Sequence, residues 1–112
     1  MNTKELHALY VKSGFFWNPE LAEFVRVYGG REIAGRKGYY RNSYYPIRFC
    51  YPKYIKQGRS NFKYVLTADF LGEDVAPVGD CDGPHTILLL TESGKLFGFS
   101  DYIIGRWGEN PH

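Results

Sequence analysis

The sequence has few cysteines and no long hydrophobic run, and each shortage excludes a class of protein. Its two cysteines, Cys50 and Cys81, are too few for the disulfide framework of a small secreted domain. No stretch approaches the roughly 18 uninterrupted apolar residues of a membrane span. The opening MNTKELHALY also lacks a basic segment followed by an apolar block. We therefore expect a soluble, cytoplasmic protein with free thiols, whose stability comes from packing.

The chain is long enough for one hydrophobic core, and its charge is unevenly distributed. At 112 residues we expect a single domain spanning residues 1–112. Residues 31–64 hold nine Lys or Arg and one acidic residue, whereas the rest of the chain holds five and eleven, although the formal net charge is only +2. The same segment holds nine of the twenty Tyr, Phe and Trp residues, a composition that suits a binding surface.

The first thirty residues have the pattern of two helices. Residues 3–13 carry apolar side chains at helical spacing, with Thr3 as the expected N-cap and Gly14 as the stop. Asn18-Pro19 is typical of a helix start, because Asn caps free N–H groups and Pro fits the first turn. The pair Gly29-Gly30 predicts the end of this second helix in a left-handed cap.

After Gly30 the pattern becomes extended, with β-branched and aromatic runs separated by turn residues. We predict strands over residues 31–34, 47–51, 62–70, 86–90 and 95–99. The polar stretch 91–94 predicts a hairpin turn with Gly94 at positive φ, and the apolar run 87–90 predicts a central strand. The expected fold is α+β, with N-terminal helices packed on a mainly antiparallel sheet. We expect its core to include Phe24, Phe70, Leu88 and Phe97.

One segment holds four residues of the kinds used in catalysis and metal binding: Asp80, Cys81, Asp82 and His85. The order Asp-Cys-Asp-Gly-Pro is typical of a turn, and nothing marks Cys81 as an activated nucleophile. The four residues mix hard and soft metal ligands without a known spacing. Gly35-x-x-Gly38 lacks the strand and helix that flank a phosphate-binding loop. We predict no catalytic residues, metal or cofactor, and thus a protein that is not an enzyme.

Two segments carry motifs of one known family, in the right order: residues 15–33, with Phe24, Tyr28, Gly29, Gly30 and Ile33, and residues 77–108, which begin with Pro77, Val78 and Gly79. They resemble the third SUKH group of bacterial immunity proteins. In residues 15–33 the helix followed by a glycine pair and a strand matches at Phe24, Tyr28, Gly29, Gly30 and Ile33. In residues 77–108 the matching block is a Pro-Val-Gly motif, an acidic loop, an apolar strand and a glycine hairpin. Its positions are Pro77, Val78, Gly79, Leu88, Gly94, Leu96, Phe97 and Gly105. Residues 36–64 match nothing in the family. Asn110-Pro111 is typical of a helix start, so we expect a SUKH-like domain whose closing helix is absent or shortened.

The resemblance implies a non-catalytic domain that binds and neutralises a cognate bacterial protein toxin by stoichiometric inhibition. Such toxins belong to polymorphic or contact-dependent systems and are often nucleases or deaminases. We expect the partner contacts in the unmatched middle, where Tyr supplies rigid anchors and Arg supplies bidentate donors. The expected contact residues are Tyr39, Tyr40, Arg41, Tyr44, Tyr45 and Arg48.

Alternatives remain open at this stage, and one of them is an enzyme centred on Cys81 and His85. The basic, Tyr-rich segment 31–64 also suits a small nucleic-acid-binding protein, or its aromatic residues simply fill a sheet. The acidic residues of a later stretch form an alternative contact face: Asp69, Glu73, Asp74, Asp80 and Asp82. The oligomeric state is not predicted, although apolar residues 102–104 suggest an interface.

Overall fold

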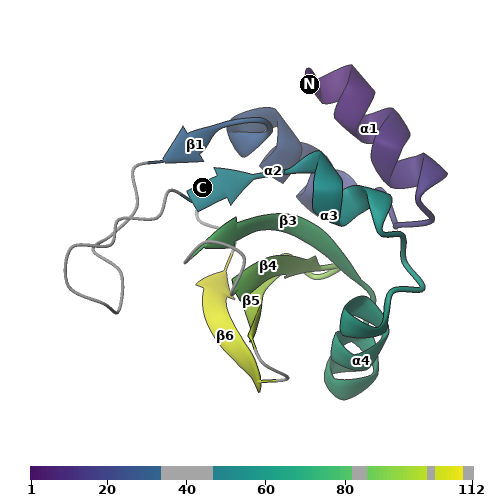
Figure 1. The fold of residues 1–112 in the computed structure, drawn as a ribbon, viewed down its shortest axis with the longest axis vertical. Coiled ribbons are helices and arrows are strands. Elements are labelled where there is room, and N and C mark those ends of the chain that lie inside the picture. Colours follow the sequence, from purple (N-terminus) through teal and green to yellow (C-terminus); the bar gives the residue numbers. More distant parts are fainter. Residues whose placement is uncertain (34–46, 82–85, 101–102, 110–112) are drawn as a thin grey trace.

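The structure is a computed structural model that describes residues 1–33, 47–81, 86–100 and 103–109 (Figure 1). The helices of this part of the chain are α1 (Thr3–Lys12), α2 (Pro19–Tyr28), α3 (Pro52–Lys56) and α4 (Phe62–Leu71). The strands are β1 (Glu32–Ile33), β2 (Ile47–Phe49), β3 (Val75–Cys81), β4 (Thr86–Thr91), β5 (Lys95–Ser100) and β6 (Ile103–Glu109). They form one sheet in chain order, and every neighbouring pair is antiparallel.

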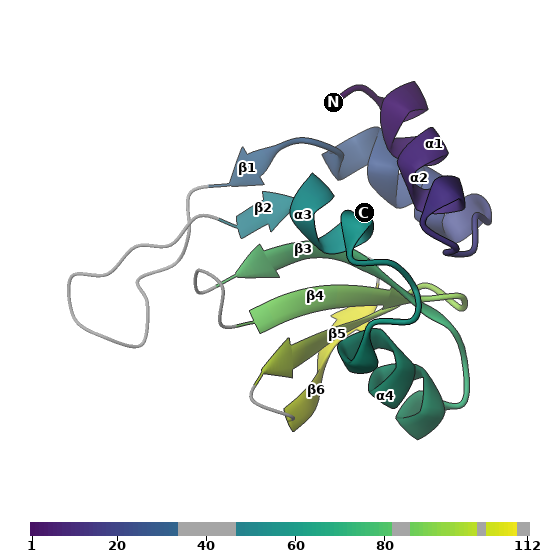
Figure 2. The same ribbon diagram turned by 45° about the vertical axis from the view of Figure 1, so that its right-hand side comes forward.

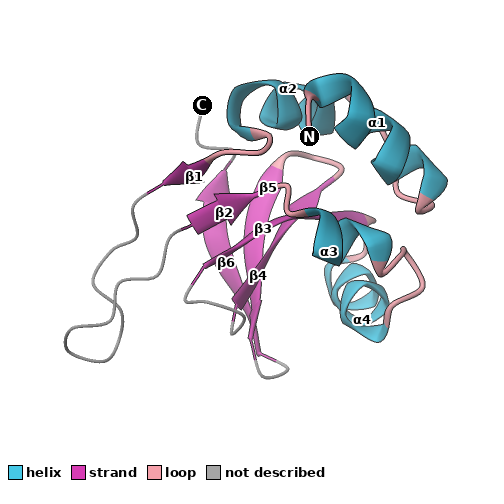
Figure 3. Ribbon diagram, turned by 45° about the horizontal axis from the view of Figure 1, so that its top comes forward, coloured by secondary structure: helices cyan, strands magenta, loops and turns pink. Residues whose placement is uncertain are grey.

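Helices α1, α2 and α3 gather beside the first strands of the sheet, whereas α4 lies apart from them at the lower right (Figures 1 and 2). Helix α1 packs on α2 and α3, and both α3 and α4 contact β3. Figure 3 shows α4 apart from α1 and α2. The predicted α+β fold, with N-terminal helices on an antiparallel sheet, is confirmed.

The ends of the first two helices follow local chemistry. The N-cap of α1 is Asn2, not the predicted Thr3, because Asn2 and Glu5 form a reciprocal capping box. The predicted start of α2 is confirmed, since the Asn18 side chain accepts a hydrogen bond from the Leu21 N–H. At its end, only Gly30 has the left-handed conformation, with φ of 74°. Gly29 has φ of −53°, and a Cβ there would lie 2.4 Å from the Val25 carbonyl oxygen.

The strand predicted over residues 62–70 is wrong, because this stretch forms α4. Its start is capped by Asn61, whose side chain accepts from the Lys63 N–H, and it ends at Gly72 with φ of 74°. Tyr64 and Thr67 are buried on its inner side. The core prediction for Phe70 is also wrong, since this side chain is 73% exposed. Phe24 and Leu88 are buried as predicted, and Phe97 is half-buried.

Three elements were not predicted: α3, β3 and β6. Strand β3 contains Pro77 and Gly79, and the sequence pattern favoured a turn over the acidic residues that follow. The structure places an irregularity in the β3–β4 pairing between Pro77 and Gly79. A Cβ at Gly79 would lie 2.3 Å from the Arg48 carbonyl oxygen, so β2 and β3 approach closely at this point.

The core lies around β4, whose residues from Ile87 to Leu90 are all buried, as the apolar run predicts. Strands β4 and β5 are joined by the predicted turn, with Gly94 at φ of 88° and its N–H bonded to the Thr91 carbonyl at 3.0 Å. The buried Tyr10 hydroxyl donates to the Pro77 carbonyl oxygen at 2.6 Å. This bond connects α1 to the middle of β3, and the neighbouring β2 carries the candidate site.

Candidate functional site

Most of the predicted contact residues lie between β1 and β2 in the sequence. Glu32 pairs with Arg48 and Ile33 pairs with Ile47, so the two strands are the base of the connection between them. Five of the predicted contact residues lie outside the described residues: Tyr39, Tyr40, Arg41, Tyr44 and Tyr45. The structure describes the sixth, Arg48, at the base of this connection.

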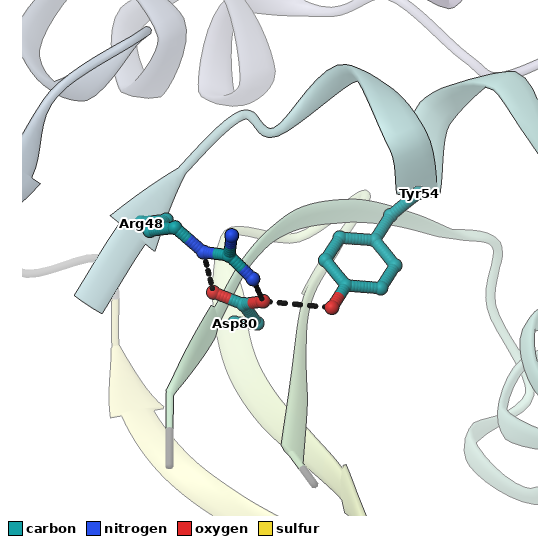
Figure 4. Close-up of polar contacts among 3 residues, drawn as sticks. All are labelled: Arg48, Tyr54 and Asp80. Atoms are coloured by element: carbon teal, nitrogen blue, oxygen red, sulfur yellow. Dashed lines mark hydrogen bonds and ion pairs between the residues drawn. The ribbon is translucent and has the colours of Figure 1, made fainter. Parts of the chain in front are cut away.

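Arg48 is held by a buried carboxylate on the neighbouring strand (Figure 4). Its Nε donates to Asp80 Oδ1 at 3.0 Å, and its Nη2 donates to Asp80 Oδ2. The Tyr54 hydroxyl, from α3, donates to the same Oδ2 at 2.7 Å. The Asp80 side chain is 0% exposed and the Arg48 side chain 28% exposed. The two-point donation that we expected Arg48 to make to a partner is therefore made to Asp80 of its own chain.

The outer side of the same guanidinium lies on a tyrosine. Arg48 Cζ is 4.2 Å from the centroid of the Tyr51 ring, which in turn packs edge-on against Tyr54. Hydrogen bonding to Asp80 raises the pKa of Arg48, and burial raises the pKa of Tyr54 to about 12. Arg48 is therefore charged and Tyr54 neutral at physiological pH. Tyr51 remains 37% exposed, so this cation–π pair, which we call the Arg48–Tyr51 pair, faces solvent in part.

A pocket of about 230 Å³ adjoins the Arg48–Tyr51 pair. Its lining includes both members of the pair, the exposed Arg31 of the segment before β1 and the exposed Glu32 of β1. It also includes Pro52, and the next residue, Lys53, is exposed. The site therefore combines two solvent-exposed cations and one exposed carboxylate with an ordered arginine and a partly exposed aromatic ring.

A larger pocket, of about 470 Å³, lies between α4 and the start of β3, away from this site. Arg59 and Asp74 at its edge are paired with each other at 2.9 Å. Because these charges are already paired and the remaining lining is mixed, we place the candidate site at the smaller pocket.

The described aromatic residues of the basic segment divide between core and surface. Phe49, Tyr54 and Tyr64 are buried, so the interpretation that they fill the protein interior holds for these three. The partnership of Asp80 with Arg48 was not predicted from the sequence. One signal was available in the sequence. Arg48 and Asp80 are each the single charged residue of an otherwise apolar stretch, and charged residues are buried only when they are paired.

The described residues of the acidic stretch do not form one contact face. Asp80 is buried beneath Arg48, Asp74 is paired with Arg59, and Glu73 accepts bonds from the Ser93 N–H and hydroxyl. Asp69 alone of the four described acids is exposed. Asp82 lies outside the described residues, so the prediction of an acidic contact face is wrong for Asp80 and untested for Asp82.

The segment that holds Asp80, Cys81, Asp82 and His85 is only partly described. Cys81 is half-buried at the end of β3, whereas His85 lies outside the described residues. Within the described part of the chain, no group of three or more His, Cys, Asp or Glu residues is placed to hold a metal ion. The helices in the same residues are all too short or too polar to cross a membrane.

Cys50 is a free, buried thiol whose residue lines the same pocket as the Arg48–Tyr51 pair. It has a left-handed φ of 54°, and its N–H donates to the Val78 carbonyl oxygen at 2.8 Å. Burial raises the pKa of the thiol to about 12. Because the nucleophile is the thiolate, this cysteine is suited to packing and not to covalent chemistry.

We expect Cys50 to resist alkylation in the folded protein. Iodoacetamide at about pH 8 should leave the Cys50 peptide unlabelled, and adding denaturant should label it fully. The raised pKa also predicts that the stability contributed by the protonated thiol is present at neutral pH and is lost as the pH rises through about 12. Mass spectrometry of the labelled peptides tests the first expectation, and rapid native labelling of Cys50 would contradict it.

Comparison of the chain with protein-family models, with curated proteins and with solved structures gives no match.

Proposed function

We propose that this chain is a SUKH-type immunity protein, which binds a cognate bacterial protein toxin with one-to-one stoichiometry and thereby blocks it. The observation that carries the proposal is the Arg48–Tyr51 pair, an ordered and partly exposed surface at the base of the tyrosine-rich connection. The resemblance of residues 15–33 and 77–108 to the SUKH immunity group supports a toxin as the partner.

The geometry favours tight binding of a protein surface. Arginine and tyrosine dominate the energetically important contacts of protein interfaces. Asp80 and Tyr51 already fix the Arg48 guanidinium, so little side-chain entropy remains to be lost when a partner binds. The nearby exposed cations Arg31 and Lys53 outnumber the exposed carboxylate of Glu32, and this balance favours a partner with an acidic surface.

Nucleic acid is the second candidate ligand, because cations and exposed aromatic rings suit phosphates and bases equally well. The two functions differ in their response to nuclease and salt. Affinity capture with the tagged protein, with and without nuclease, should retain one large polypeptide through its C-terminal segment in both conditions. Bound material that disappears with nuclease or moderate salt would overturn the toxin proposal and favour nucleic acid.

We expect the double charge reversal Arg31→Glu/Lys53→Glu to weaken binding of the captured partner by about tenfold or more, mainly through slower association. Both residues are exposed and unpaired among the described contacts, so the fold should be unaffected. Surface plasmon resonance at two salt concentrations measures the effect, which should shrink at high salt.

The matched control is Lys4→Glu/Lys12→Glu on the exposed side of α1, which changes the net charge by the same amount. It should bind like the wild type. An equal loss of affinity in both variants would mean that only net charge matters, and would remove the Arg48–Tyr51 pair as the binding site.

A further inference from the structure

The larger pocket, of about 470 Å³, shares no lining residue with the pocket beside the Arg48–Tyr51 pair. Its walls come from segments that are far apart in the sequence: the C-cap of α1, residues 58–60, α4 and the start of β3. Its volume falls within the range of roughly 300–1,000 Å³ that is typical of small-molecule sites. The pocket is therefore large enough for a small organic ligand.

The charges of this pocket leave one carboxylate without a counter-ion. The lining holds one cation, Arg59, and two carboxylates, Asp69 and Asp74. Arg59 Nη2 donates to both carboxylate oxygens of Asp74 at 2.9 Å, so these two charges offset each other. The Asp69 side chain is exposed and forms no hydrogen bond or ion pair with any residue that the structure describes. The lining therefore has one uncompensated negative charge.

Much of the remaining lining is apolar and provides a surface for an alkyl stem. The side chain of Val75 is buried, and Val65 is 43% exposed. Ala68 and Asp69 follow Val65 by three and four positions, so the three residues share one side of α4. An alkyl stem that lies along Val65 and Ala68 therefore brings its end to the level of the Asp69 carboxylate.

We infer that this pocket binds a small organic ammonium ion, with the ammonium group against Asp69 and the alkyl stem against Val65 and Val75. An ammonium group carries one positive charge and three donors, so it supplies the counter-ion that Asp69 lacks. An anion would be repelled by Asp69, and the cation Arg59 is already paired with Asp74. A metal ion is also disfavoured, because the described residues hold no group of three or more His, Cys, Asp or Glu suited to one.

Titration of the ¹⁵N-labelled protein with n-pentylammonium chloride tests this site without any toxin, so its outcome is independent of the proposed function. Amide chemical shifts should change in residues 58–60, 64–69 and 74–75 and should saturate. The dissociation constant should be roughly 1 mM, which suits a ligand of this size. The neutral 1-pentanol and the anion pentanoate should each bind more weakly by about tenfold or more, since neither supplies the positive charge.

The ammonium group has two sources, a free amine and a lysine side chain. The probe Nα-acetyl-lysine methylamide separates them in the same titration. A lysine source predicts that this probe binds more tightly than n-pentylammonium, and a free amine predicts the reverse order.

Two variants with the same change in charge locate the ligand. Asp69→Asn should weaken binding of n-pentylammonium by about tenfold, because it removes the carboxylate that the ammonium group contacts. The control Glu20→Gln, at an exposed carboxylate of α2 outside the pocket, should leave the affinity unchanged. Circular dichroism of each variant confirms that it is folded. Equal affinity for n-pentylammonium and 1-pentanol would overturn the inference, as would shifts outside the pocket or unchanged affinity in Asp69→Asn.

Discussion

Replacing Gly79 with alanine should lower the free energy of unfolding by about 3 kcal/mol or more. The new Cβ would lie 2.3 Å from the Arg48 carbonyl oxygen and 3.4 Å from the Phe49 Cα. These are backbone atoms of β2, which cannot rotate away as a flexible side chain can. The clash is relieved only if β2 moves from β3, and that movement separates Arg48 from Asp80.

Urea unfolding followed by circular dichroism measures this effect. The matched control is Gly105→Ala, another glycine within a strand, where an added Cβ meets no atom within 4 Å. The control should change the free energy of unfolding by no more than about 0.5 kcal/mol. Equal effects at the two glycines would show that the close approach of β2 to β3 is not a constraint on the fold.

Replacing Arg48 with alanine should lower the free energy of unfolding by about 3–5 kcal/mol, because it leaves a buried carboxylate without its cation. Asp80 is fully buried, and after the change the described structure leaves it only the Tyr54 hydroxyl as a side-chain donor. Arg48 is thus unsuitable as a surface variant for testing partner binding, although its sequence context favours a contact role.

Two comparisons separate the buried pair from an ordinary ion pair. Arg26→Ala removes the exposed pair with Glu23 and should cost no more than about 1 kcal/mol. The double variant Arg48→Met/Asp80→Leu should recover much of the lost stability, since it removes both buried charges together. Thermal unfolding measures all three variants. If Arg48→Ala and Arg26→Ala have the same effect, the Arg48–Asp80 pair has no special structural role.

The fold class, the first two helices and the β4–β5 hairpin could be predicted because each depends on local signals. Asn18 caps its own helix, and Gly94 supplies the positive φ of its turn. Helix α4 was mistaken for a strand because Phe62, Val65 and Thr67 have high strand propensity. The capping residue Asn61 and the glycine at position 72 were the better signals, since they bound the helix on both sides.

The candidate site could be predicted only in part, because its geometry depends on residues far apart in the sequence. The segment rich in Tyr and Arg was visible from composition. The bond between Arg48 and Asp80, thirty-two residues later, depends on the β2–β3 register. This register was not predicted, because Pro77 and Gly79 concealed β3 in the sequence. The exposed face of α4 was hidden for a related reason. A pattern interpreted as a strand placed Phe70 in the core, whereas the helical period turns it outward.

Neutralisation of the captured partner tests the proposed function most directly. The C-terminal domain of that partner, expressed in a host cell, should stop growth, and co-expression of the wild-type chain should restore it. Arg31→Glu/Lys53→Glu should restore growth poorly, whereas Lys4→Glu/Lys12→Glu should restore it fully. Growth that is unaffected by the partner domain, or that the wild-type chain fails to restore, would contradict an immunity function. Equal rescue by both charge variants would contradict the assignment of the binding surface to the Arg48–Tyr51 pair.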